Sequence, residues 1–270
     1  MSPLSLALKP RRPALLRGEA QTLDLMIALQ APDIPAGHEQ RHMPLRLAIV
    51  LLPSCNAQAT TAFLDPLRAA NYLAGRPLFV WDFLSLDGAP VVASNGMTFA
   101  ATTALSAARR EATLVVVSAS WTPEVHGSPA LRRWLKACDR RGATLVALDT
   151  GAIVLAAAGL LDGHAATVHY EHLAAFREQF PAVRVSEALY VLDRERWSCA
   201  GGAAAADMAL ELVRSQHSAD LANAAARYIF HDRLRSPTDR QRPAPREPIG
   251  QTVPEALQRA IALMTAHLEE

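Results

Sequence analysis

The stretch LVALDTGAIVLAAAGLLDG, Leu145–Gly163, decides the fold of this chain. Its first four residues are apolar, as in a parallel strand that is covered on both faces. Asp149 and Thr150 are typical helix N-cap residues, and the Ala/Leu-rich run that follows should continue as a helix to Gly159. The stretch therefore predicts a buried strand that turns sharply into a helix, with Asp149 at the bend.

The residue at such a bend points toward the carboxyl edge of the sheet, where open α/β folds bind ligands. Many enzymes place a Ser or Cys nucleophile there, whereas this chain has a carboxylate. Asp149 is a poor acyl-transfer nucleophile but a good hydrogen-bond acceptor or counter-ion for a cation. The alternative is that Asp149 only caps its helix, and the two roles are compatible.

Length and composition indicate one sizeable domain with a small appendage, because half of the 270 residues are apolar. The 27 basic and 26 acidic residues give a net charge of +1, so the whole chain has no strong bias toward nucleic acid or acidic membranes. The three cysteines form no CxxC pair, and no apolar run reaches the roughly 18 residues of a membrane span. Since no signal-peptide pattern is present either, we expect a cytoplasmic protein.

Strands and helices alternate along the middle of the chain. Strands are predicted at 45–53, 78–88, 112–120, 145–148, 166–171 and 183–201, a short hairpin at 93–101, and helices at 60–75, 128–142 and 203–217. Pro66 either interrupts the first helix or lies in its first turn. The alternation predicts an α/β fold, a doubly wound and mostly parallel sheet of the flavodoxin-like type with helices on both faces.

The two ends of the chain differ in character from this middle part. Residues 1–43 are punctuated by proline and are predicted to form a weakly ordered arm before a domain at 44–233. The segment 234–252 is rich in Pro and Arg and is predicted to be a linker. Residues 253–270 predict an amphipathic helix whose apolar positions are Leu257, Ile261, Met264 and Leu268. One such helix cannot bury its apolar stripe alone, so it must dock on the main domain, pair between subunits or begin a further domain.

Six motifs, in this order, carry a family resemblance: FLDPLRAANYLAG, ASNG, LDTGAIVLAAAGLLDG, ATVHYEHLAAF, SCAGGAAAADMALELV and HDRLRSPTDRQR. Together they resemble the GlxA-like, amidotransferase-like regulators of the AraC family, over about Leu45 to Glu270. The resemblance implies that 44–233 is a PfpI-type, class I glutamine amidotransferase-like domain that senses a small molecule. It also implies that 253–270 is the first helix of a helix-turn-helix domain, so that DNA is bound only through a C-terminal part missing from this chain.

The resemblance also implies where the ligand binds. The family's elbow Cys and its assisting His correspond to Asp149 and His169, so hydrolysis would be lost with the nucleophile and no cofactor is expected. Members with DTG at the elbow resemble a branch that senses arginine, glycine betaine or carnitine. The ligand would then be a small cationic metabolite bound by Asp149, Thr150 and the elbow.

Four further residues are candidates for the same site. Trp121 follows a predicted core strand and could stack on a quaternary ammonium, although a packing role is an alternative. Tyr170 follows His169. Cys55 lies in the first strand-to-helix turn, which departs from the Gly-aromatic turn of the family. Asp65 matches an acidic residue that points toward the elbow in related domains, and its alternative role is capping before Pro66.

Two classes of function remain open at this point. The first is the sensing module of a transcription regulator, which we expect to be a homodimer because such regulators bind paired half-sites. The second is a PfpI-type or amidotransferase-like hydrolase with another nucleophile such as Cys55, which lies on the wrong turn for that chemistry. Cys199 has no candidate base and is predicted to be a buried structural thiol. No membrane partner is expected.

Overall fold

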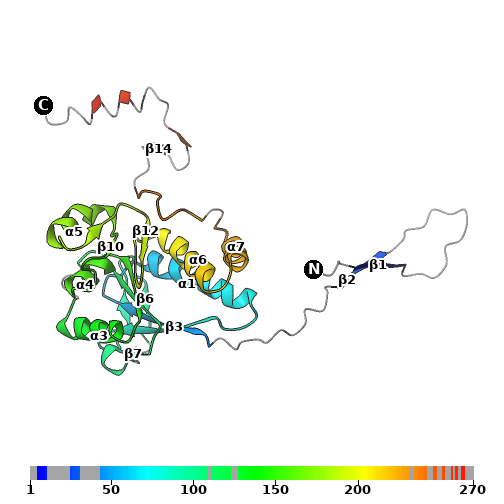
Figure 1. Cartoon of the computed structure of the whole chain (residues 1–270), viewed down its shortest axis with the longest axis horizontal. Coiled ribbons are helices and arrows are strands. Elements are labelled where there is room, and N and C mark those ends of the chain that lie inside the picture. Colours follow the sequence, from blue (N-terminus) through cyan, green and yellow to red (C-terminus); the bar gives the residue numbers. More distant parts are fainter. Residues whose placement is uncertain are drawn as a thin grey trace, which may run out of the picture. The chain divides into compact units, whose positions relative to one another are not determined.

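Figure 1 shows the computed structural model of the chain. The structure describes residues 43–101, 103–108, 111–122, 127–231 and 234–241, together with a few short pieces outside these ranges. The chain divides into two compact units, Met1–His42 and Met43–Glu270. In the first unit, β1 (Ser5–Pro10) and β2 (Leu25–Gln30) form an antiparallel pair, which the proline-punctuated sequence did not predict.

A seven-stranded sheet forms the centre of the second unit, in the order β12-β13-β9-β8-β3-β4-β7. Its strands are β3 (Leu45–Leu51), β4 (Phe79–Ser85), β7 (Thr103–Ala104), β8 (Leu114–Ala119), β9 (Thr144–Asp149), β12 (Tyr190–Asp193) and β13 (Arg196–Cys199). All neighbours are parallel except β12 and β13. The core order, β4-β3-β8-β9-β13, is the flavodoxin-like arrangement. The predicted fold class is therefore confirmed.

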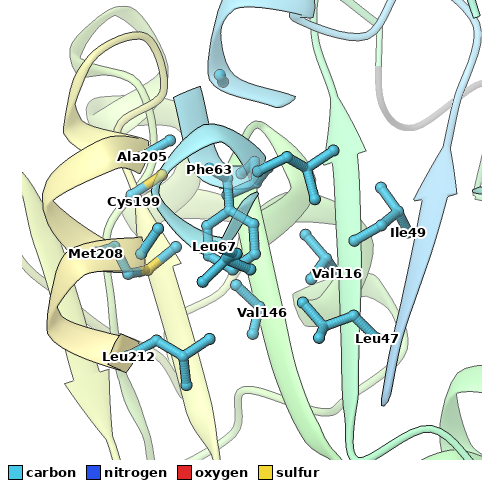
Figure 2. Close-up of a cluster of buried hydrophobic side chains, with 14 of the residues drawn as sticks. Leu47, Ile49, Phe63, Leu67, Val116, Val146, Cys199, Ala205, Met208 and Leu212 are labelled. Atoms are coloured by element: carbon cyan, nitrogen blue, oxygen red, sulfur yellow. The ribbon is translucent and has the colours of Figure 1, made fainter. Parts of the chain in front are cut away.

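Helices cover both faces of this sheet, as the unbroken apolar runs of β3, β8 and β9 require. The helices are α1 (Ala57–Leu73), α3 (Pro129–Asp139), α4 (Gly151–Ala157), α5 (Leu173–Gln179), α6 (Ala204–Gln216) and α7 (Ala219–Tyr228). Alternate residues of β3 enter two separate cores, Leu47 and Ile49 on the face of α1 and α6, and Ala48 and Val50 on the face of α3 and α4. Figure 2 shows the first core, in which Phe63 packs among residues of these elements.

The first long helix begins earlier than predicted and is not interrupted. Asn56 caps α1 by accepting a hydrogen bond from the backbone N–H of Ala59. Pro66 lies in the middle of the helix, where it removes one backbone donor. Pro66 is buried and the helix continues on both sides of it, so both predicted positions for this proline were wrong.

The region after α4 is less regular than predicted. The strand expected at 166–171 is reduced to β10 (Ala165–Ala166), which pairs with β11 (Arg184–Val185), and the segment at 183–201 is divided between β11, β12 and β13. A 3₁₀ turn, η2 (Tyr170–His172), leads into α5. The expected hairpin at 93–101 is present as the pair β5 (Val91–Val92) and β6 (Thr98–Phe99). Another 3₁₀ turn, η1, spans Leu105–Ala107. The helix α7 was not predicted.

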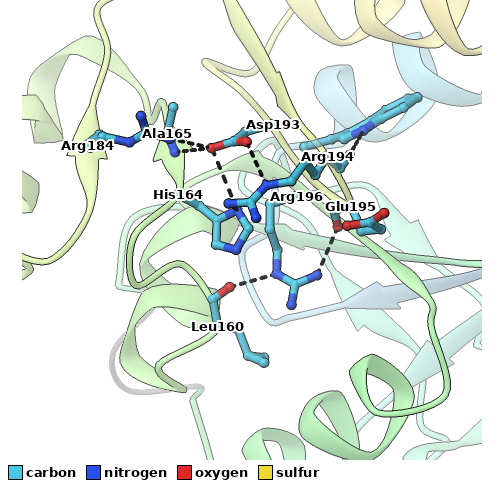
Figure 3. A network of polar contacts seen from close by, with 9 residues as sticks. Leu160, His164, Ala165, Arg184, Asp193, Arg194, Glu195 and Arg196 are labelled. Atoms are coloured by element: carbon cyan, nitrogen blue, oxygen red, sulfur yellow. Dashed lines mark hydrogen bonds and ion pairs between the residues drawn. The ribbon is translucent and has the colours of Figure 1, made fainter.

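A polar network at the β12–β13 turn fixes this less regular region (Figure 3). The Asp193 carboxylate accepts hydrogen bonds from the backbone N–H of Ala165 at 2.7 Å and from Arg184 at 2.9 Å. The backbone N–H of Ala165 is the largest cause that holds the pKa of Asp193 below its ordinary value, and Arg194 and His164 act in the same direction. Arg196 donates to the carbonyl of Leu160 at 2.7 Å. The network thus ties β13 to the loop that follows α4.

The part of the chain after α7 packs on the domain for some distance. Residues 234–241, assigned to a linker by composition, include a β-bridge between Arg240 and Ala188. Further on, β14 (Arg246–Glu247) pairs with β15 (Gln251–Thr252). Helical backbone is described at 257, 259–260 and 263–264, where Leu257 and Met264 are exposed, while Ile261 and Leu268 of the predicted stripe lie outside the described residues. No helix in the described part of the chain is long and apolar enough to cross a membrane.

Candidate functional site

The predicted elbow is present at the junction of β9 and α4. Asp149 is the last residue of β9 and has a φ of 59°, a conformation that is uncommon for residues other than glycine and in which Asn, Asp and His are the most frequent of them. The helix begins at Gly151, where a Cβ would lie 2.3 Å from the carbonyl oxygen of Val117 on β8. Only glycine fits this close approach, so the sequence Asp-Thr-Gly permits the turn.

The Asp149 side chain is nearly enclosed, with 4% of its surface exposed. Its Oδ2 accepts a hydrogen bond of 2.7 Å from the side-chain amide of Asn56, which follows β3. On another side lies Gly201, in the turn after β13, where a Cβ would be 2.8 Å from the same oxygen. The carboxylate is therefore held between the carboxyl ends of β3 and β13.

Burial raises the pKa of Asp149 above its ordinary value. The hydrogen bond from Asn56 opposes this shift, as do the positive charges available on His169 and His172 and the backbone N–H of Thr150. The N-cap residue of α4 is Thr150, so the predicted alternative in which Asp149 only caps this helix does not describe its contacts. A nearly dry carboxylate near several donors is suited to binding a cation or a hydrogen-bond donor.

Thr150 lies beside Asp149 and contributes an unsatisfied polar group. It is the N-cap residue of α4, yet its side chain makes no capping hydrogen bond. Its Oγ1 is buried and has no hydrogen-bond partner in the described part of the chain. Buried hydroxyl groups are usually paired, so this oxygen is available to a ligand or a water molecule at the elbow.

The loop after β10 supplies the histidines of the site. His169 immediately precedes η2, and its ring lies 4.4 Å from that of Tyr170 and 6.4 Å from that of His172. Its Nδ1 lies 3.7 Å from a carboxylate oxygen of Glu171. The charge of His169 influences the pKa of Asp149, so the structure brings these two predicted residues within electrostatic reach. Tyr170 is 38% exposed and flanks His169.

Trp121 lies just beyond the same edge of the sheet. Ala119, the last residue of β8, pairs with Asp149 in the sheet register, and Trp121 follows two residues later. Its side chain is 69% exposed and its φ is 53°, which is unfavourable for a bulky residue. Trp121 is thus not a core residue, which weakens the packing alternative.

Cys55 does not offer its side chain to this edge. The thiol is fully buried in the core on the α1 side of the sheet, and burial raises its pKa to about 11. A protonated thiol of this kind is neither a good ligand nor a good nucleophile. The neighbouring residue Asn56, and not Cys55, contacts Asp149 from this turn. The position of Asn56 at the start of the first helix, directly after a core strand, was the signal in the sequence that could have found it.

Asp65 is the second correction. It lies on the exposed side of α1 and accepts a hydrogen bond of 3.0 Å from Arg68, whose guanidinium lies over the ring of Tyr228 at 5.7 Å. The inward packing of Phe63 and Leu67 turns Asp65 toward solvent. The structure therefore does not place Asp65 beside Asp149.

Two other features of the sequence have structural roles here. Cys199 is buried, and burial raises its pKa to about 12, in agreement with a structural thiol. A cavity of about 380 Å³ opens at the carboxyl ends of β3 and β4 and is lined by Ser54, Ser85 and Asp87 among others. Asp149 does not line this cavity. Among the described residues, no group of His, Cys, Asp and Glu side chains is arranged to hold a metal ion.

A flavodoxin-like sheet with a strained elbow between its fourth parallel strand and the next helix defines the class of α/β domains that place a functional residue at this bend. The signature of the DJ-1/PfpI family matches residues 67–215. This chain belongs to the DJ-1/PfpI family, as the resemblance implied.

Its curated relatives are transcription regulators. The chain is 40% identical over 193 residues to the HTH-type transcriptional regulator CdhR of Pseudomonas aeruginosa, covering 72% of this chain and 57% of the relative. It is 36% identical over 245 residues to the regulator GbdR of the same species, covering 89% and 64%. It is 31% identical to the regulator GlxA of Rhizobium meliloti, covering 78% and 65%. The chain thus spans about two thirds or less of the length of these relatives.

A solved structure agrees with these relationships. The AraC family transcriptional regulator from Pseudomonas putida superposes with a TM-score of 0.62 at 31% identity, over 69% of this chain and 100% of the solved one. The Toxoplasma gondii DJ-1 structure, at 22% identity and a TM-score of 0.59, shares the fold. The curated relatives are regulators, which is consistent with a non-catalytic, regulatory sensing role for this domain.

Proposed function

We propose that residues 44–233 form the small-molecule-sensing domain of an AraC-type transcription regulator and that Asp149 binds the cationic nitrogen of the ligand. The ligand class is that of arginine, glycine betaine or carnitine. In the same proposal, residues 253–270 begin a helix-turn-helix domain, and DNA binding belongs to sequence beyond this chain. A regulator of this type would act in the cytoplasm, as a homodimer.

The observation that carries the ligand class is the environment of Asp149. Its carboxylate is 4% exposed, while the Thr150 hydroxyl beside it has no partner among the described residues. A cation that reaches a carboxylate in such dry surroundings gains more Coulomb energy than at an exposed ion pair. Trp121 adds an exposed indole beyond the neighbouring strand, which is suited to a quaternary ammonium.

The hydrolase alternative finds no support in the thiols. Cys55 and Cys199 are both buried with raised pKa values, so neither is an activated nucleophile. The residue at the elbow itself is a hydrogen-bonded carboxylate.

A binding experiment with three ligand probes tests this proposal. Arginine, glycine betaine and carnitine, each with an uncharged analogue, are added to the 270-residue protein and to Asp149→Asn, and thermal unfolding is followed. A probe at 100 times its Kd stabilises the folded state by about 2.7 kcal/mol. We expect a cation-selective increase in Tm that is lost in the variant. Equal increases in both proteins contradict the role of Asp149, and no increase with any probe contradicts the ligand class.

A further inference from the structure

The segment after α7 returns to the domain and pairs with it beside β12. The backbone N–H of Leu189 donates to the carbonyl of Asp239 at 2.9 Å, and that of Gln241 donates to the carbonyl of Glu187 at 3.1 Å. The bridge between Ala188 and Arg240 lies between these two hydrogen bonds. Residues 234–241, called here the return segment, therefore form a backbone attachment to the domain.

A buried carboxylate fixes the start of the return segment. Asp207 on α6 is fully buried and accepts hydrogen bonds from His231 at 2.8 Å and from both the backbone and the side chain of Arg235, at 2.9 and 2.8 Å. The hydroxyl of Tyr190 donates to the carbonyl of Arg235 at 3.2 Å. A buried carboxylate with this many donors fixes its partners in one arrangement.

The other end of the return segment contacts the loop of the candidate site. The side-chain amide of Gln241 donates to Thr167 Oγ1 at 2.8 Å, to the carbonyl of Val168 at 2.9 Å and to the carbonyl of Ala188 at 3.2 Å. Val168 directly precedes His169. One side chain thus joins the return segment to the backbone next to His169, whose charge acts on the pKa of Asp149.

We propose that Gln241 is a positioning residue for the candidate site. It couples the loop after β10 that contains His169, called here the His169 loop, to the return segment. A ligand that orders the His169 loop then tightens the attachment of the return segment, and the attached segment in turn raises the affinity for the ligand, because coupling between two sites is reciprocal. The effect on ligand affinity rests on the proposed function, whereas the coupling between the His169 loop and the return segment is independent of it.

Hydrogen exchange tests the coupling without any ligand. Gln241→Met keeps the length of the side chain and removes its donors, while Thr238→Ala is the matched control, since the Thr238 hydroxyl is bonded to Ser236 within the return segment. The reporters are the amides of Thr167, which donates to Ser198, and His172, which donates to the carbonyl of His169. We expect exchange at both to be about 5-fold faster or more in Gln241→Met and unchanged in Thr238→Ala. Equal exchange in the two variants overturns the proposal.

Titration with arginine, glycine betaine and carnitine tests the functional side of the coupling. If one of these probes binds the native chain, its Kd should rise about 5-fold or more in Gln241→Met and stay unchanged in Thr238→Ala. An unchanged Kd in Gln241→Met overturns the positioning role even if its Tm is lowered. If none binds the native chain, the proposed ligand class fails, while the exchange result still decides the coupling. Thr167→Val, which removes one acceptor of Gln241, is the second variant if Gln241→Met does not fold.

Discussion

The side-chain amide of Asn56 donates a hydrogen bond of 2.7 Å to the carboxylate of Asp149, a residue 93 positions later in the chain. The contact joins the carboxyl ends of β3 and β9, with β8 between them in the sheet. Asn56 also caps α1 with its side-chain oxygen. One residue therefore fixes both the first helix and the elbow carboxylate.

Substitution of Asn56 should separate these two roles. Asn56→Ser keeps a capping oxygen but is too short to reach Asp149, whereas Asn56→Ala loses both contacts. We expect Asn56→Ala to lower the free energy of unfolding by about 1–2 kcal/mol more than Asn56→Ser, which measures the cap. Urea denaturation gives this difference, and identical midpoints for the two variants contradict the capping assignment. Both variants should weaken binding of a cationic probe, because Asp149 loses its orienting donor.

Gly201 should tolerate substitution less well than its neighbour Gly202. Both residues have positive φ, so both alanine variants have backbone strain. A Cβ at Gly201 would lie 2.8 Å from Asp149, whereas one at Gly202 would meet only Gln58, at 3.8 Å. We expect Gly201→Ala to be less stable than Gly202→Ala by about 1–3 kcal/mol, the cost of overpacking. Comparable losses of stability would show that Asp149 moves away easily.

Cation binding should weaken at acid pH because the pKa of Asp149 is raised. Protonation removes the counter-ion, and it begins at a higher pH than for an ordinary Asp, whose pKa is about 3.9. His169, His172 and Glu171 are other ionisable groups in this region, so binding is measured over the same pH range on Asp149→Asn. Calorimetric titration gives the affinity for the cation at each pH, and the difference between the native chain and Asp149→Asn is the contribution of Asp149. The same pH dependence in both proteins would contradict the role of Asp149.

The raised pKa of Asp149 also makes the stability of the fold depend on pH in a defined direction. The folded state holds the Asp149 proton more tightly than the unfolded state does, so this group's contribution to the free energy of unfolding falls as pH rises from the unfolded pKa through the raised folded pKa.

The pH dependence of the contribution from Asp193 has the opposite sign, because the folded pKa of Asp193 is lowered. Its contribution is present above the unfolded pKa and is lost as pH falls through the folded value. Asp193→Asn should therefore lower the urea midpoint at pH 7 and have less effect at pH 3, while Asp65→Asn, at an exposed ion pair, should have little effect at either pH.

The cysteines should react slowly in the folded protein. All three are free and buried, and the pKa of Cys55 is about 11. Alkylation by iodoacetamide at pH 8, followed by mass spectrometry, should label the native chain much more slowly than the urea-unfolded chain. Rapid labelling of native Cys55 would restore the hydrolase alternative.

Local rules were sufficient to predict the elbow. Apolar residues at 145–148, the small residues after Asp149 and the terminal Gly159 each favour the same strand-turn-helix from short-range chemistry. The alternation of such units predicted the sheet and its helical layers. Each of these predictions needs only a stretch of fewer than about 20 neighbouring residues.

The contacts around Asp149 could not be predicted in this way. Asn56 and Gly201 reach the carboxylate from distant strands, and only the assembled sheet order makes them neighbours. Asp65 was misplaced because the start of α1 at Ala57 and the inward packing of Phe63 set which side of the helix it occupies. The reduced strand at Ala165–Ala166 was missed because short-range patterns do not report the pairing that limits a strand.

Positive φ angles at Ser54, Trp121 and Asp149 occur at or just beyond the carboxyl ends of three adjacent parallel strands, β3, β8 and β9. Each of these residues adopts a conformation that glycine would adopt at lower cost, so replacing Ser54 or Trp121 by glycine should make the fold more stable. Backbone strain that gathers at one rim of a sheet is characteristic of sites that hold their groups in place before a ligand arrives, at the expense of robustness.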